Sequence, residues 1–425
     1  MTSTRPYNSM SLQGPLVIVA EDAPTGLADR LGSDGAFPVV WTRADQTADA
    51  VAAAQPSAIL LADTEAAGNE RVALLLTETI TARMPIVPVI ACASVDQEIP
   101  YREALPLPAD ASADMISTRI SSALRVRELH AAVLRRAELA KEKGQALPSQ
   151  PTTDPLEDAC IIVAGRGRDY PGIATAVAER AGLIGAFSIE IAARYLKARD
   201  ADGLLIADGF NPWNVGALLT VLSEDSRFRD LPVGILGQPA PPTSIGLIHT
   251  IHATDPQRLV ARLAPLARLH AFEARLRRLM ESFDSNGVID PVTGLHVTDS
   301  FLQALDHALR KAEERGTGLS IARFVFDGGG RMKADAARLV SKLIRGADFA
   351  CQDDDGSVLV VFTATDLKDA HIVARRIASV LKHTMLAPGS SATPTAPDVI
   401  LAARKADDDI ATLLARVSAP AVAAE

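Results

Sequence analysis

The chain has few aromatic residues, few cysteines and no long apolar run, and each shortage excludes a class of protein. Aromatic side chains make up 4% of its 425 residues, and 52 Asp and Glu against 43 Lys and Arg give a net charge of −9. A nucleic-acid partner needs clustered cations and stacking platforms, so none is expected. Cys92, Cys160 and Cys351 lack the paired spacing of a zinc site or a disulfide framework, so we expect no metal site.

Two further absences concern membranes and secretion. The chain begins without the apolar core of a secretion signal. Its most apolar stretch, Met84 to Val95, is short and broken by proline, so we expect no membrane span. Together these features favour a cytoplasmic protein in a reducing compartment.

The chain does have enough hydrophobic residues to form the cores of several domains. Hydrophobic residues make up 48% of the chain, and its length favours about three domains. Two amphipathic runs, 116–141 and 259–280, predict long helices. A segment rich in Pro, Gly, Ser and Thr follows the first helix, and the turn-forming sequence Asp284-Ser-Asn-Gly287 follows the second. We therefore expect domains at 14–143, 158–283 and 284–425, with a linker at 144–157 between the first two.

The first two segments follow one plan. Each opens with a short β-rich run, then a turn and an Ala-rich helix, and the later apolar runs also correspond. The matching pairs are 16–20 with 160–164, 58–63 with 203–208, and 87–91 with 231–236. Continuous apolar strands separated by helices indicate a parallel sheet covered on both faces. The pattern predicts two doubly wound, flavodoxin-like α/β domains.

This arrangement resembles the receiver domains of response regulators in two-component systems, whose first strand ends in acidic metal ligands. Glu21 and Asp22 match that acidic pair in the first copy. The second copy has Gly165-Arg-Gly-Arg168 there, which does not suit Mg²⁺. The resemblance therefore implies receiver-like domains with damaged chemistry.

The residues at the phosphoacceptor position also indicate damaged receiver chemistry. The resemblance places it on Ala62 and Ala207, with Asp63 and Asp208 one residue later. Receivers also need a lysine after this Asp to neutralise the phosphoryl group, but the first 140 residues contain none and Lys197 precedes the acceptor strand of the second copy. We expect no phosphorylation, although a one-residue insertion could still present Asp63. Docking and dimerisation through the helices are the expected roles.

The third segment opens with Asp290-Pro-Val-Thr-Gly-Leu295, followed by a helix, a strand, a helix, a hairpin and a helix. Six residues alone also fit a plain helix start after an Asp-Pro turn. The order of elements, however, resembles the GGDEF domains of diguanylate cyclases, which have a cyclase palm-like α/β fold. The resemblance implies a domain of that fold over residues 284–425.

The signature turn of the family is altered here. The turn of the expected hairpin reads Asp354, Asp355, Gly356 and Ser357, so carboxylates stand where glycines admit the nucleotide phosphates, and Gly and Ser stand where the acids belong. Upstream, Asp327 matches only one of two metal-binding aspartates, and the three glycines after it are read as a turn across a shortened helix. The resemblance implies a degenerate cyclase domain with no catalytic residues and no required cofactor.

One constellation of the family is kept, namely the inhibitory site that binds cyclic di-GMP. Arg345-Gly-Ala-Asp348 fits its Arg-x-x-Asp, with five residues between Asp348 and Asp354, and the second arginine of the site falls on Arg376. Guanidinium groups bind phosphate and guanine, and a carboxylate accepts from guanine N1 and N2. A solvated Arg345–Asp348 salt bridge is the alternative. The spacing alone is weak, since it recurs at Arg166, Arg199, Arg227 and Arg404.

Three hypotheses follow. The leading one is a non-catalytic cyclic di-GMP receptor that relays binding through protein contacts, and the resemblance implies polar localisation and a link to cell-cycle regulators. The second is a scaffold that binds no nucleotide. The third is an active cyclase or phosphoacceptor. The two long helices could also pair subunits of a homodimer through their apolar stripes.

Overall fold

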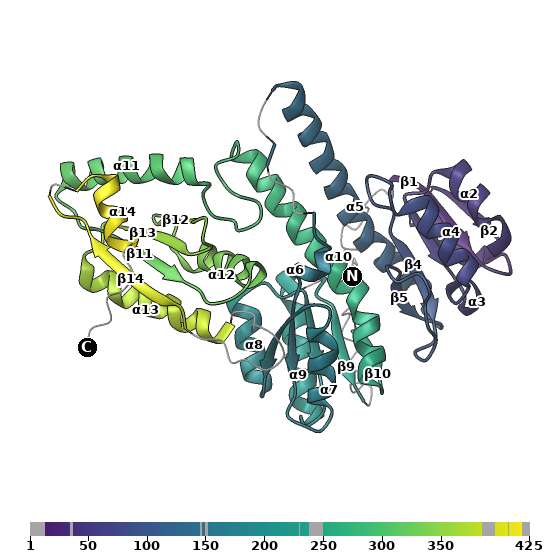
Figure 1. The fold of residues 1–425 in the computed structure, drawn as a ribbon. Coiled ribbons are helices and arrows are strands. Elements are labelled where there is room, and N and C mark those ends of the chain that lie inside the picture. The colour runs from purple at the N-terminus through teal and green to yellow at the C-terminus, as the bar shows by residue number, and fades with distance from the viewer. Residues whose placement is uncertain are drawn as a thin grey trace, which may run out of the picture.

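The computed structural model describes residues 13–34, 37–144, 147–148, 152–228, 230–237, 250–384, 396–406 and 408–418. They form three units, which we call the first (13–144), second (152–284) and third (285–418) units. In Figure 1 the three lie in a row, with the second unit between the other two. The fold is mixed α/β, with two parallel sheets and one antiparallel sheet.

The first unit is a parallel sheet with strand order β2-β1-β3-β4-β5, the order of flavodoxin-like doubly wound folds. Alternate strand residues pack on opposite faces, against α1 and α5 on one and against α2, α3 and α4 on the other. The elements are β1 (Gln13–Val19), α1 (Thr25–Ser33), β2 (Phe37–Thr42), the 3-10 turn η1 (Ala44–Gln46), α2 (Thr47–Ala54), β3 (Ala58–Leu61), α3 (Thr64–Ala67), α4 (Glu70–Ile80), β4 (Val89–Ala93), β5 (Leu105–Pro108) and α5 (Ala113–Glu142).

The second unit repeats this sheet as β10-β9-β8-β6-β7, so the expected internal copy is confirmed at the level of strand order. Helices α7 and α10 cover one face, and α8 and α9 the other. Its elements are α6 (Pro155–Asp158), β6 (Cys160–Ala164), α7 (Tyr170–Ala178), β7 (Gly182–Ala186), α8 (Ile189–Ala198), β8 (Gly203–Ile206), α9 (Pro212–Glu224), η2 (Ser226–Phe228), β9 (Val233–Leu236), β10 (Thr250–Ala253) and α10 (Pro256–Asp284). The short helix α6 overlaps the end of the linker expected at 144–157 and the first residue of the domain expected at 158–283.

The third unit has an antiparallel sheet of order β12-β13-β11-β14. Helices α12 and α13 pack on one face and α11 and α14 on the other. The elements are α11 (Thr298–Arg315), β11 (Leu319–Val325), α12 (Gly330–Leu343), β12 (Phe349–Gln352), β13 (Val358–Thr363), α13 (Leu367–Thr384), β14 (Asp398–Ala403) and α14 (Ile410–Ser418). The sequence between α13 and β14 predicts a Pro/Ser/Thr-rich loop over 387–397, and residues 387–395 of it lie outside the described residues.

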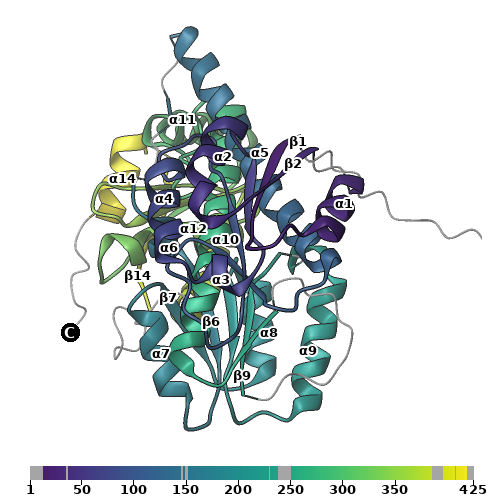
Figure 2. The ribbon, with the colours of Figure 1, turned by 90° about the vertical axis from the view of Figure 1, so that its right-hand side faces the viewer.

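The long helices α5 and α10 pack against each other within one chain, as Figures 1 and 2 both show. Val126 and Val133 of α5 meet Leu276 and Leu279 of α10 in a separate apolar cluster. The helices were expected to offer their stripes to a second subunit. Here the two helices pack against each other, so these four side chains are buried inside a single chain.

The first two units share one continuous core. Residues of β5 and α5 join residues of α7 and α10 in a single buried cluster. Polar contacts border it: Arg125 Nη2 donates to Asp230 at 2.8 Å, and Arg258 Nη1 pairs with Asp96 at 2.8 Å. The first and second units therefore form one packed body.

The third unit is held to the second by a buried ion pair. Arg199, at the C-terminal end of α8, donates through Nη2 to Asp335 of α12 at 2.5 Å and through Nη1 at 3.2 Å. Both side chains are only 4% exposed. Arg199 also donates to the carbonyl oxygen of Thr384, the last residue of α13. One guanidinium thus holds both helices on that face of the third sheet.

Candidate functional site

The turn between β12 and β13 holds the residues for which the sequence predicts a degenerate signature, and the carboxylates of Asp353 and Asp355 are engaged within the chain. Asp355 accepts from the Ser357 amide at 2.8 Å and from Arg323 Nη2 at 2.7 Å. Hydrogen bonding by Ser357, supported by Arg323, lowers the pKa of Asp355 to about 2. Arg323 also pairs with Asp353 at 3.1 Å. Arg323, from the neighbouring strand β11, is therefore the cation partner of two of the turn carboxylates.

A second cation closes the other side of the turn. Lys333 of α12 donates through Nζ to the carbonyl oxygen of Asp355 at 2.6 Å. Gly356 has φ +81°, and a Cβ there would lie 2.4 Å from Cδ of Lys333. Glycine thus allows both the left-handed backbone and the close approach of the lysine. Asp354 is exposed at the tip of the turn.

The end of β11 leads directly into α12 through the three glycines. Asp327 is exposed, Gly328 has φ +144°, and α12 begins at Gly330. The structure thus has a turn where the sequence predicted one. Among the described residues no group of three or more His, Cys, Asp or Glu side chains is placed to hold a metal ion.

Arg345 and Asp348 are brought together at the corner before β12. Arg345 Nε donates to Asp348 Oδ2 at 2.8 Å, and Arg345 Nη2 donates to Thr365 Oγ1 at 2.6 Å. Asp348 Oδ1 accepts from the Thr363 amide at 3.0 Å. The carboxylate is 1% exposed, whereas the Arg345 side chain is 58% exposed. Asp348 therefore orients Arg345, and its hydrogen bond raises the pKa of that guanidinium.

Arg376 is exposed on α13 and makes no ion pair with another described residue. Helix α13 begins at Leu367, and Arg376 lies nine residues further on, about 13 Å along the helix axis. Among the described residues, no hydrogen bond joins it to Arg345. The three expected ligand residues thus form one fixed pair and one separate arginine.

Asp63, the expected vestigial phosphoacceptor, caps a helix. Its Oδ1 accepts from the Ala66 amide at 2.7 Å at the start of α3, and its Oδ2 accepts from the Glu21 amide at 2.9 Å. Asp208 of the second unit caps no helix, but it makes the equivalent contact to the loop after β6, where its Oδ2 accepts from the Arg168 amide at 2.9 Å. In both copies a carboxylate after the third strand holds the loop after the first strand.

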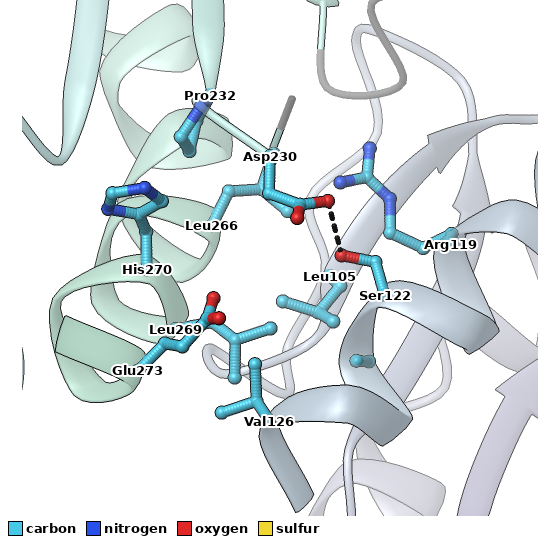
Figure 3. A pocket seen from close by; sticks show the side chains of 11 residues that line it. Leu105, Arg119, Ser122, Val126, Asp230, Pro232, Leu266, Leu269, His270 and Glu273 are labelled. Carbon is cyan, nitrogen blue, oxygen red and sulfur yellow. Dashed lines mark hydrogen bonds between the residues drawn. The ribbon is translucent and has the colours of Figure 1, made fainter. Parts of the chain in front are cut away.

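Two hollows lie elsewhere. Figure 3 shows a cavity of about 20 Å³ between the first and second units, where Ser122 donates to Asp230 at 3.0 Å. Burial lowers the pKa of Arg119 beside it to about 9, and the space fits about one water molecule. An open groove of about 650 Å³ lies between α11 and α14. Neither is lined by Arg345 or Arg376.

Sequence reasoning missed the cations that close the turn. Arg323 follows Ala322 and precedes Phe324, so strand alternation places it on the face opposite the α12 side of the sheet. Only the register of β11 with β13 shows that it reaches the turn carboxylates. The helix-capping role of Asp63 did have a signal, since an Asp followed by Thr-Glu and two alanines is a typical helix start.

Comparison with known proteins gives weak similarities. No family model matches the chain, and no curated protein matches it. Solved structures similar to part of it include the coiled coil and GGDEF domain of DgcB from Caulobacter crescentus in complex with c-di-GMP, at 20% identity, covering 34% of this chain and 83% of that one, with a TM-score of 0.29. The diguanylate cyclase SiaD with its activator SiaC from Pseudomonas aeruginosa has 18% identity, covering 33% and 59%, at a TM-score of 0.29.

The GGDEF domain of FimX from Pseudomonas aeruginosa has 16% identity, covering 31% of this chain and 89% of that one, at a TM-score of 0.27. The similar structures include GGDEF domains, and they also include the glyoxylate/hydroxypyruvate reductase SmGhrA from Sinorhizobium meliloti, at 16% identity, covering 66% of this chain and 100% of that one, with a TM-score of 0.17. Identities and TM-scores this low assign neither family nor function. Separately, no helix within the described residues is long and apolar enough to cross a membrane.

Proposed function

We propose that the chain is a non-catalytic cyclic di-GMP receptor with two receiver-like units and a degenerate GGDEF unit. Arg345 and Arg376 contact the dinucleotide, and Asp348 fixes Arg345. Binding is relayed through protein contacts, in cell-cycle or localisation control that includes a polar position in the cell. Cyclic di-GMP is a ligand here, and no cofactor is required.

The observation that carries this proposal is the state of Arg345. Two of its nitrogens are fixed by Asp348 and Thr365, while more than half of the side chain faces solvent. A guanidinium held in one orientation loses little entropy when it binds phosphate or guanine. By contrast, Asp353 and Asp355 of the turn already pair with Arg323, and the exposed Asp354 would repel a triphosphate. The unit therefore favours binding of the dinucleotide over its synthesis.

Calorimetric titration of cyclic di-GMP into the full chain tests the proposal. Arg345→Ala and Arg376→Ala should each weaken binding about ten- to hundredfold, because each removes charge-assisted hydrogen bonds. Arg315→Ala, at the end of α11 on the opposite face of the sheet, is the matched control and should leave affinity unchanged. Wild-type protein given GTP and Mg²⁺ should release no pyrophosphate. No binding to the wild type at micromolar concentration would refute the receptor.

A specific observation favours one other function. Both oxygens of Asp348 are used inside the chain, so the Arg345–Asp348 pair also suits a purely structural corner. In a scaffold that binds no nucleotide, Arg345→Ala would lower stability by removing the contacts to Asp348 and Thr365, but the wild type would show no binding of cyclic di-GMP. The calorimetry above separates the two.

A further inference from the structure

Helix α13 has two different faces. Its buried residues, Ala370, Ala374, Ile377 and Leu381, pack into the core beneath the sheet. Its exposed face carries Lys368, Arg375, Arg376 and Lys382 around Ile372. At about 100° per residue, the four cations fall within an arc of roughly 120° that contains Ile372. The exposed face is thus a continuous cationic stripe along the helix.

These cations are not neutralised within the described chain. None of the four forms an ion pair with a described carboxylate. The nearest acids on the helix are at its first turn, where Asp366 accepts from the Asp369 amide at 2.8 Å and so caps the helix. On α11, by contrast, Arg310 pairs with Asp306. The exposed face of α13 therefore carries four positive charges in a chain whose net charge is −9.

An exposed aliphatic side chain lies within the stripe. Ile372 is 61% exposed, and Lys368, Arg375 and Arg376 lie three or four residues away, on the same side of the helix. An apolar anchor ringed by charges is the arrangement of a small protein-binding site. Figure 1 shows α13 along the lower edge of the third unit, on the side away from α11.

We propose that this face of α13, which we call the α13 face, docks an acidic, aliphatic-bearing segment of a partner protein. The helix is about 27 Å long, which suits a short helix or extended segment. Charge complementarity argues for such a local contact, because exposed charges act mainly within a Debye length of about 8 Å. A nucleic acid or an anionic bilayer would extend over the acidic remainder of the chain, and the α13 face has no aromatic platform.

Under the proposed function, the α13 face shares Arg376 with the dinucleotide site. The coupling between the two ligands rests on that function, whereas the docking surface does not. A bound cyclic di-GMP would place phosphate charge at one margin of the stripe. The dinucleotide and the acidic segment should therefore oppose each other's binding, with reciprocal loss of affinity. This gives the receptor a way to release or exchange a partner when the dinucleotide binds.

The test uses the full chain and a fluorescein-labelled peptide of glutamates with leucine at every fourth position, followed by anisotropy at low salt. The triple variant Lys368→Gln, Arg375→Gln and Lys382→Gln should weaken peptide binding at least tenfold. The matched control, Arg310→Gln, Lys311→Gln and Arg315→Gln on α11, should leave it unchanged. Ile372→Ala should weaken it severalfold. All these side chains are exposed, so the fold should be retained in circular dichroism.

The outcomes are distinct. No peptide binding by the wild type, or equal weakening in both triple variants, would overturn the proposal. Tighter α13-dependent binding of single-stranded RNA or phosphatidylserine vesicles would overturn the choice of a protein partner. The α13 triple variant keeps Arg345 and Arg376, so its cyclic di-GMP titration should stay normal. If peptide binds through α13 but cyclic di-GMP does not bind the wild type, the receptor is refuted and the docking surface stands.

Discussion

Replacing Asp335 by alanine removes one half of the ion pair buried between the second and third units, and Arg199 then keeps a buried charge. Burial tends to lower the pKa of Arg199, but Asp335 offsets this and the pKa is raised overall. Both side chains are 4% exposed, so little water can reach the remaining guanidinium. Breaking a buried pair in this way costs about 3–5 kcal/mol. Asp335→Ala should therefore open the contact between α12 and the second unit.

Hydrogen exchange measures this loss locally, which matters because a chain of several units need not unfold in one step. At 1.4 kcal/mol per tenfold change, the amides of α12 should exchange roughly a hundredfold to several-thousandfold faster. Arg199→Met with Asp335→Leu should recover most of the protection, since an apolar pair of similar volume needs no buried charge. Asp306→Ala breaks an exposed pair and serves as control. Acceleration below tenfold, or no recovery in the double variant, would refute the reasoning.

The remaining predictions concern the turn and the first unit. Gly356→Ala should lower the melting temperature, because φ is +81° and the new Cβ meets Lys333, whereas Gly329→Ala, with open space around it, should not; equal effects would contradict this. The folded pKa of Asp355 lies below the ordinary value, so its stabilising contribution is present above about pH 4 and is lost as pH falls towards 2. Asp355→Asn should reduce the fall in melting temperature between about pH 4 and pH 2, and an unchanged fall would contradict this prediction. Asp63→Ala should destabilise the body formed by the first and second units by about 1–2 kcal/mol in urea, because a helix cap is lost. Wild-type protein given acetyl phosphate should gain no phosphoryl group.

The elements and their order could be predicted from sequence because they depend on local patterns. The continuous apolar strands, the two long amphipathic helices and the Asp-Gly hairpin all follow from periodicity and turn chemistry. The turn at Gly356 has the positive φ that its glycine indicated. The repeat of the first sheet in the second followed from matching apolar runs, since strand order depends on these runs and short connections.

The contacts that decide the site could not be predicted this way. Arg199 and Asp202 have the same spacing as Arg345 and Asp348, yet Arg199 pairs with Asp335, 136 positions away, and Asp202 binds His270 at 3.0 Å. An Arg-x-x-Asp spacing therefore specifies no partner by itself. The pairing depends on how whole units pack, and sequence periodicity carries no information on that.

The continuous core of the first and second units limits how the chain can be divided. A fragment that ends after α5 would expose the surface of β5 and α5 that α10 now covers, and the rest of the chain would expose the matching side of α10. Each piece would present a large apolar area to water and would tend to aggregate. Evolution could therefore exchange the third unit, whose contacts with the second are largely polar, far more easily than it could separate the first two.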